Sequence, residues 1–287
     1  MTMCFFVSDL HGREEQYEKL FNKIASDRPD AVFIGGDVLP HGSFIVKTID
    51  ISHRDFINDY LVVKFSNLQD ELKDQYPRVF IILGNDDGRF EELSVLDAGV
   101  TGIWEYMHNR KIEFKEWVVY GYSYIPPTPF QLKDWERYDV SRSVDPACIP
   151  PEEGIRTIPV SEYEQKYATI KDDLDKLVND DPLEHAIFLF HSPPYQTNLD
   201  RADLDGKTID HAPLCVNVGS IAIQRFIDKY QPLLTLHGHV HESARITNSW
   251  KDKIGRTYMF SAAHDGSELS IIRFELEDLS SAKRELI

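Results

Sequence analysis

The sequence predicts an α/β fold, in which short apolar strands alternate with amphipathic helices. In the N-terminal third, apolar runs at residues 4–7, 31–34 and 79–83 have the length and side-chain content of buried strands. Each run ends in a polar loop, and helical periodicity follows the first two loops. This alternation favours parallel pairing of the strands, with ligands bound beyond their carboxyl ends.

Apolar spacing predicts helices in four segments, at residues 17–24, 56–72, 163–177 and 221–230. The third is expected to be one continuous helix, because its apolar residues follow each other at steps of three or four. Further strands are predicted at residues 117–122, 186–190, 233–236, 256–261 and 269–274. The last two are expected to be antiparallel, because no long crossover connection fits between them.

A segment rich in proline and aromatic residues, 125–160, interrupts this pattern. Its seven prolines exclude regular helices and central strands over much of its length. Phe130, Trp135 and Tyr138 are expected to be buried, which favours an ordered surface excursion beside the functional site. A disordered loop is the alternative. We interpret residues 1–287 as a single domain that carries this excursion.

Composition restricts the partners and the compartment. A net charge of −17 creates a field that repels polyanions, which makes nucleic acid an unlikely partner. The cysteines Cys4, Cys148 and Cys215 are odd in number and widely spaced, so we expect free thiols, as in the cytoplasm. No signal peptide and no apolar run of about 20 residues is present, which predicts a cytoplasmic protein that does not cross a membrane. The oligomeric state does not follow from the sequence.

Side chains that bind metals stand at five predicted strand ends. They are Asp9 with His11, then Asp37, Asn85, His191, and His239 with His241. Turn chemistry explains one such strand end but hardly five in succession. Two carboxylates, four imidazoles and one amide oxygen suit two divalent first-row metal ions better than calcium or magnesium. In the last cluster, Gly238 is expected to allow a tight turn, and His237 has no assigned role.

The motifs resemble those of the calcineurin-like metallophosphoesterases. That family carries Asp-x-His, Gly-Asp, Gly-Asn-His followed by an acid, a lone His, and Gly-His-x-His. The corresponding stretches here are Asp9-Leu10-His11, Gly36-Asp37, Gly84-Asn85-Asp86-Asp87, His191 and Gly238-His239-Val240-His241. The match spans residues 9–241, and the segments 126–130 and 133–136 resemble a group of prokaryotic members. The resemblance implies a four-layer α/β/β/α sandwich of two mixed sheets flanked by helices.

The resemblance also implies a ligand set and a mechanism. Asp9, His11, Asp37 and His241 would hold one metal ion, while Asn85, His191 and His239 would complete a second ion bridged by Asp37. Manganese, iron, zinc and nickel all suit these ligands. A hydroxide that bridges the two ions would attack the phosphorus of a small phosphate ester in line.

Asp86 departs from the family pattern, because a histidine usually follows the asparagine. Two neighbouring cations would lower the pKa of an aspartate here, so Asp86 would be a poor general acid at neutral pH. We therefore expect a preference for phosphodiesters or for esters with acidic leaving groups. Asp86 can instead orient a water molecule, or simply cap the turn. His41 is a candidate catalytic substitute, whereas His53, His211 and His264 are expected at the surface. Arg13 and Arg89 can contact phosphate or lie on helix surfaces.

Other functions stay open at this point. Some proteins of this fold are non-catalytic scaffolds, but all seven expected ligand residues are retained here. A metal-dependent nuclease and a phosphomonoesterase are further alternatives; the net charge disfavours the first and Asp86 the second.

Overall fold

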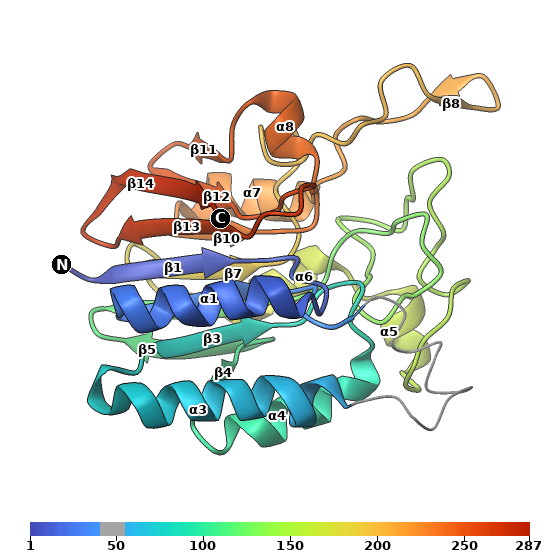
Figure 1. Cartoon of the computed structure of the whole chain (residues 1–287). Coiled ribbons are helices and arrows are strands. Elements are labelled where there is room, and N and C mark those ends of the chain that lie inside the picture. The colour runs from blue at the N-terminus through green and yellow to red at the C-terminus, as the bar shows by residue number, and fades with distance from the viewer. Residues whose placement is uncertain (41–54) are drawn as a thin grey trace.

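Two six-stranded mixed sheets pack face to face, with helices on both outer surfaces (Figure 1). The computed structural model describes residues 1–40 and 55–287. The first sheet has the order β14-β13-β1-β2-β3-β4. Its strands are β1 (Met3–Val7), β2 (Ala31–Gly35), β3 (Arg78–Ile82), β4 (Glu105–Tyr106), β13 (Ser270–Glu275) and β14 (Asp278–Leu286). Strands β1 to β4 are parallel, whereas β13 is antiparallel to both β1 and β14.

The second sheet has the order β11-β12-β10-β7-β6-β5. Its strands are β5 (Arg110–Phe114), β6 (Trp117–Tyr122), β7 (Ala186–Phe190), β10 (Leu234–His237), β11 (Lys251–Ile254) and β12 (Thr257–Ser261). The four strands β6, β7, β10 and β12 are parallel, and the two edge strands are antiparallel to their neighbours. A separate hairpin joins β8 (Thr208–Ile209) to β9 (Ala212–Pro213).

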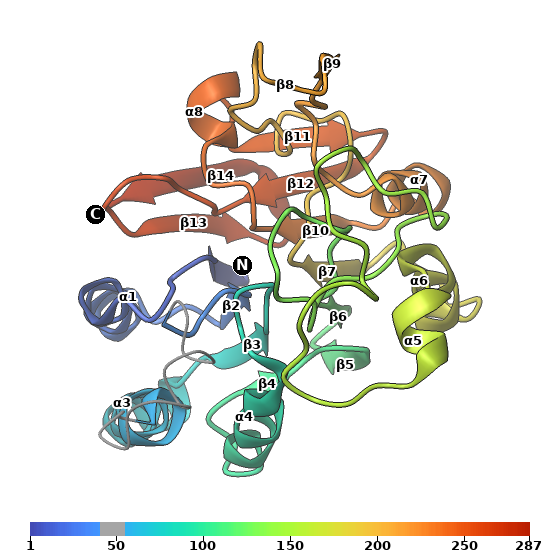
Figure 2. The same ribbon diagram turned by 90° about the vertical axis from the view of Figure 1, so that its right-hand side faces the viewer.

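The helices cover the outer faces of the two sheets. They are α1 (Glu14–Asp27), η1 (Phe56–Leu61), α3 (Val62–Leu72), η2 (Lys73–Gln75), η3 (Arg89–Glu91), α4 (Glu92–Gly99), α5 (Glu162–Lys166), α6 (Ile170–Val178), α7 (Ile221–Tyr230) and α8 (Ser243–Thr247). Figure 2 shows α1 and α3 on one side of the molecule and α6 and α7 on the other. The predicted four-layer α/β/β/α sandwich is therefore confirmed.

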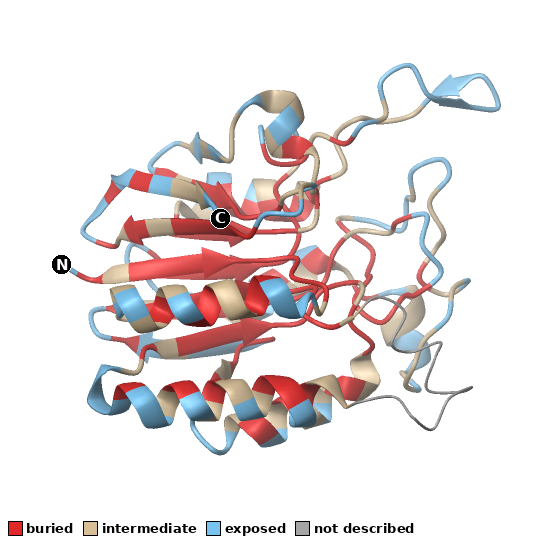
Figure 3. Ribbon diagram, viewed as in Figure 1, coloured by how far each residue is buried: buried red, intermediate tan, exposed pale blue. Residues whose placement is uncertain are grey.

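Alternating side chains on the strands build the layers. Cys4 and Phe6 of β1 belong to the apolar cluster between the sheets, which also contains Leu189 of β7. Phe5 and Val7 point the other way and pack in the cluster that includes side chains of α1. Figure 3 shows that the central strands are buried. Because both of their faces are covered, these strands are almost continuously apolar.

Two expectations about secondary structure are wrong. The segment 163–177 forms two helices, α5 and α6, because the chain between them pairs with the excursion. There the Ile170 N–H donates to the Tyr138 carbonyl over 2.7 Å. The Thr169 hydroxyl then caps α6 by accepting from the Asp172 N–H. Strands β12 and β13 do not pair, because they belong to different sheets and the chain between them crosses from one sheet to the other.

The excursion is ordered and carries buried polar groups. Trp135 and Tyr138 are buried as predicted, but Phe130 is 56% exposed, so that part of the prediction is wrong. Lys133 and Glu136 form a fully buried ion pair, and the Lys133 ammonium also donates to the Thr128 carbonyl. Among the described residues, no helix has the length and apolarity that crossing a membrane requires.

Candidate metal centre

The candidate ligands lie at the carboxyl ends of parallel strands from both sheets. Asp9 and Asp37 follow β1 and β2 at the same distance along the chain, and these two strands pair with each other. Figure 2 looks onto this end of the sheets. Asp9, His11, Asp37 and His239 all have positive φ angles, between 46° and 73°. Asp and His adopt this left-handed conformation more readily than most other residues, so these ligand types suit the turns that they form.

Two glycines allow the ligand loops to approach each other. A Cβ atom on Gly84 would lie 2.3 Å from Oδ1 of Asp37, and one on Gly238 would lie 2.8 Å from Oδ2 of Asp9. The tight turn expected at Gly238 is instead made by His239, which has a φ of 73°. Gly238 is needed for close packing.

Asp9, His11, Asp37 and His241 form one group whose donor atoms lie within 4.8 Å of each other. Nε2 of His241 is 3.4 Å from Oδ1 of Asp9 and 3.3 Å from Nε2 of His11. Nε2 of His11 is 4.0 Å from Oδ2 of Asp37. Two carboxylates and two imidazoles at these separations fit a divalent first-row metal ion.

A second group shares Asp37 with the first. Nε2 of His191 lies 3.3 Å from Oδ2 of Asp37 and 3.0 Å from Oδ1 of Asn85. The ring of His239 lies beside that of His191, with 5.3 Å between centroids. This group also has the composition of a metal site, and the shared carboxylate is Asp37.

Backbone contacts orient several of these side chains. Nδ1 of His191 lies 2.8 Å from the Gly35 carbonyl, so the proton on Nδ1 is donated there and Nε2 faces Asp37 and Asn85. Oδ1 of Asp9 accepts a hydrogen bond from the His239 N–H, and the Ser8 hydroxyl donates to Oδ2. The donor atoms are therefore positioned by the fold itself.

The carboxylates of the cluster favour protonation of two neighbouring histidines. Burial acts to raise the pKa of Asp9, but the hydrogen bond from His241 and its charge lower it to about 2. Burial acts to lower the pKa of His191, but Asp37 raises it to about 10, and Asp9 likewise raises that of His241 to about 9. Burial lowers the pKa of His239 to about 3. Protonated imidazoles thus provide the positive charge that divalent ions would provide, and metal binding would release these protons.

A family comparison agrees with this geometry. The family model described as calcineurin-like phosphoesterase matches residues 4–243. The chain belongs to the calcineurin-like phosphoesterase family. This membership implies a hydrolase that acts on phosphate esters. The comparison with curated protein sequences found no match.

Solved structures share the calcineurin-like fold with this chain at low sequence identity. One aligns with a TM-score of 0.59 and 16% identity over 100% of this chain and 98% of its own. The protein TT1561 of Thermus thermophilus aligns with a TM-score of 0.55 and 15% identity over 99% and 98%. A dimetal phosphatase from Danio rerio aligns with a TM-score of 0.52 and 12% identity over 94% and 91%. These likenesses show the fold alone.

Two aspartates follow Asn85, and they have different surroundings. Oδ2 of Asp86 lies 3.6 Å from Nδ1 of His11, and its side chain is 27% exposed. Asp87 is fully buried, and its carboxylate accepts hydrogen bonds from the N–H groups of Val38, Leu39 and Gly84. Asp87 therefore ties the loop after β2 to the loop after β3. Sequence reasoning missed this role, although a second acid in a ligand loop is a usable signal.

The remaining polar candidates lie in other surroundings. Nδ1 of His237 donates to the Ser192 carbonyl and Nε2 accepts from the Thr235 hydroxyl, so both ring nitrogens are used. Arg89 pairs with Glu164 and Glu92. Arg13 donates to the Gly266 carbonyl, His264 pairs with Glu268, and His211 is exposed. His41 and His53 lie outside the described residues.

Proposed function

We propose that this calcineurin-like phosphoesterase hydrolyses phosphate esters with two divalent metal ions that share Asp37. The observation that carries the proposal is the position of the Asp37 carboxylate between two donor groups. One contains His11, and the other contains His191. Two cations at close range repel each other, so a shared anionic ligand is a physical requirement of such a pair.

Each candidate ligand has a role in this proposal. Asp9, His11, Asp37 and His241 would hold the first ion, and Asp37, Asn85, His191 and His239 the second. When bound, the two ions would polarise the phosphoryl oxygens and neutralise the charge that develops on them. The chain supplies the fixed orientation: the Gly35 carbonyl aims Nε2 of His191, and the His239 N–H holds the Asp9 carboxylate.

Asp86 is the basis for a proposed preference among esters. Its carboxylate faces Nδ1 of His11, which favours a proton on Nδ1 and leaves Nε2 for the metal ion. An ionised carboxylate with this role would not protonate a leaving group. Esters with acidic leaving groups need that protonation least, so we expect them, and phosphodiesters that release such a group, to be better substrates than alkyl monoesters.

The ligand types indicate which metal ions are bound, and the cysteines indicate the compartment. Four imidazoles favour manganese, iron, zinc or nickel over calcium. We also propose a cytoplasmic location, which is supported by the three free cysteines.

A substrate panel tests the proposal. The protein would be loaded with each metal and assayed on p-nitrophenyl phosphate and on bis(p-nitrophenyl) phosphate. We expect hydrolysis that requires metal, with the higher kcat/KM on the diester. A protein that binds no stoichiometric metal and hydrolyses neither ester would instead be a scaffold. A much higher rate on the monoester would contradict the expected preference for diesters. Equal kcat/KM values on p-nitrophenyl phosphate and on glycerol 2-phosphate, whose leaving group needs protonation, would contradict the proposed role of Asp86.

A further inference from the structure

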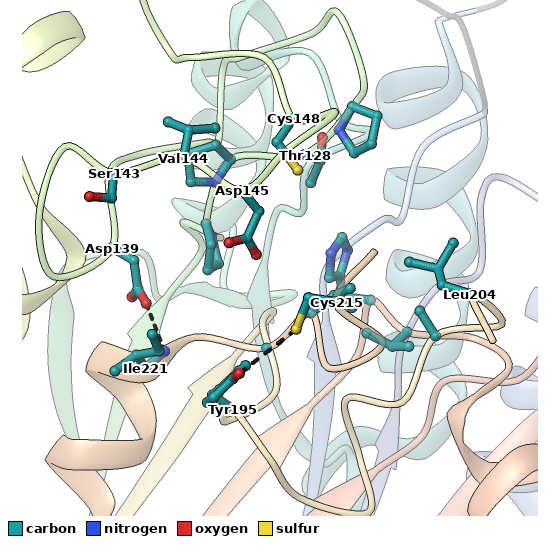
Figure 4. Close-up of a pocket in the computed structure, with 18 of the residues that line it drawn as sticks. Thr128, Asp139, Ser143, Val144, Asp145, Cys148, Tyr195, Leu204, Cys215 and Ile221 are labelled. Carbon is teal, nitrogen blue, oxygen red and sulfur yellow. Dashed lines mark hydrogen bonds between the residues drawn. The ribbon is translucent and has the colours of Figure 1, made fainter. Parts of the chain in front are cut away.

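A cavity of about 450 Å³ opens beside the candidate metal centre. The excursion forms one wall through segments such as 126–130, and the loop after β7 forms the opposite wall. His239, a candidate ligand of the second metal ion, belongs to the lining. Figure 4 shows Val144 and Cys148 across the cavity from Tyr195 and Leu204. A cavity of this volume is large enough for a small organic ligand.

The lining is largely apolar and lacks a positively charged side chain. Prolines of the excursion contribute apolar surface, together with Val144, Leu204 and Val218. Among the described residues of the lining, none is Arg or Lys. Asp145 and Glu242 are present and carry negative charge. A second phosphate or a carboxylate in this cavity would therefore lose its hydration without a compensating cation.

Several polar groups of the lining are already used within the protein. The carboxylate of Asp139 accepts hydrogen bonds at the start of α7, from the Ser220 hydroxyl and the Ile221 N–H. The Thr128 hydroxyl donates to Glu136, and the Tyr195 hydroxyl lies 3.7 Å from Sγ of Cys215. These groups stabilise the walls, and they make the cavity less suited to a strongly polar ligand.

We propose that this cavity receives an uncharged apolar or aromatic group of the phosphate ester and excludes esters that carry a second anionic group there. The inference rests on the proposed function, because the phosphate would bind at the metal centre beside His239. An organic group attached to that phosphate would then enter the cavity and remove its apolar surface from water. A second anion would meet Asp145 and Glu242 instead.

Cysteine labelling tests occupancy of the cavity without measuring hydrolysis. Cys148 and Cys215 line the cavity, whereas Cys4 is fully buried. The metal-loaded protein would be alkylated with iodoacetamide, and each site would be followed by peptide mass spectrometry. Diphenyl phosphate at ten times its dissociation constant should slow alkylation of Cys215 about tenfold by mass action. Dimethyl phosphate and bis(4-carboxyphenyl) phosphate at the same concentration should not protect it, and equal protection by all three would overturn the proposal.

A substitution that fills the cavity tests its effect on selectivity. Leu204→Trp should lower kcat/KM for bis(p-nitrophenyl) phosphate about tenfold or more, since pocket shape sets such ratios. The inhibition constant of inorganic phosphate should not change, because phosphate needs only the metal centre. Leu93→Trp is the matched control, since Leu93 lies on α4 and is 76% exposed. An unchanged kcat/KM in a folded Leu204→Trp protein would contradict the inference.

The two proposals can fail separately. Protection of Cys215 by diphenyl phosphate in a protein that hydrolyses no ester would refute the proposed function but support the cavity assignment. Hydrolysis of the diester with no protection of Cys215 would refute the cavity assignment alone. If Leu204→Trp does not fold, the labelling experiment on the unchanged protein still decides the question.

Discussion

The candidate metal centre and the adjacent cavity are built in different ways, although His239 belongs to both. The metal centre lies at the ends of parallel strands, and its side chains are held by backbone groups such as the Gly35 carbonyl. The cavity lies between irregular segments, and its excursion wall is held by buried side-chain pairs such as Lys133 with Glu136. We therefore expect catalysis to depend on the residues at the strand ends, and selectivity between esters to depend on the excursion. The two properties should therefore respond to different substitutions.

Asp37→Asn should have the largest effect. It should reduce catalysis without changing the selectivity that the cavity provides. The amide keeps the shape of the side chain but removes the shared negative charge between the two donor groups. We expect kcat/KM to fall by more than about 100-fold, because loss of a residue that only hydrogen-bonds to a metal ligand typically costs about 10- to 100-fold. The variant should also bind less metal. Steady-state kinetics and elemental analysis measure these effects. Asp70→Asn is the control, because the Asp70 side chain is 83% exposed; full activity of Asp37→Asn would show that Asp37 is not a bridge.

Lys133→Met should affect the excursion and leave the metal centre intact. It leaves the Glu136 carboxylate buried without its cation, which costs about 3–5 kcal/mol of stability. Limited proteolysis should then cut within residues 125–160, while bound metal stays unchanged. The double variant Lys133→Met with Glu136→Leu should recover part of the loss. Loss of metal from the single variant would mean that the two regions are not independent.

Asp86→His should change the preference between esters without changing the cavity. A histidine beside the metal centre can protonate a poor leaving group, so kcat/KM on glycerol 2-phosphate should rise about tenfold or more relative to that on p-nitrophenyl phosphate, whose leaving group needs no acid. Asp86→Asn separates the loss of the carboxylate from the gain of an acid. The ratio of these two monoester activities is measured in all three proteins, and an equal ratio would rule out this role of the position.

His108, which packs against the excursion, should make the stability of the protein depend slightly on pH. Burial and the guanidinium groups of Arg89 and Arg137 hold the pKa of His108 well below its usual 6.5, and its ring packs on Trp135. The unfolded chain therefore binds a proton below about pH 6.5 that the folded chain does not, so stability falls as the pH decreases. Between about pH 7.5 and 5.5 this residue should contribute about 1 kcal/mol.

His108→Gln is the comparison for this pH effect. Glutamine can still accept from the Ser123 N–H, as Nδ1 of His108 does, but it does not titrate. Denaturant unfolding at the two pH values should show a smaller pH difference in the variant. An identical difference in both proteins would show that His108 does not contribute.

The sequence predicts the metal centre better than the cavity, for a physical reason. Apolar strands that end in Asp, Asn or His are local patterns, and parallel pairing brings their ends together. Asp9, Asp37 and His191 therefore converge as the pattern indicates, while their role as ligands stays a prediction. The second acid in this ligand loop is visible in the sequence, but the hydrogen-bond partners of Asp87 are not, because they come largely from another loop.

Long-range contacts explain the other differences between sequence and structure. The break between α5 and α6 depends on the contact of Ile170 with Tyr138, which lies far away along the chain. The cavity likewise requires the excursion to pack opposite the loop after β7. Apolar periodicity contains no information on such contacts, so it predicts one continuous helix. The aromatic character of Phe130 likewise predicts burial without showing what would cover the ring.

Anomalous diffraction from crystals of the manganese-loaded protein tests the central claim most directly. We expect two peaks about 3.5–4 Å apart, with the Asp37 carboxylate between them. The peak on the far side from His11 should be coordinated by Asn85, His191 and His239. A single peak at Asp9, His11, Asp37 and His241, with none beside His191, would contradict the two-metal account.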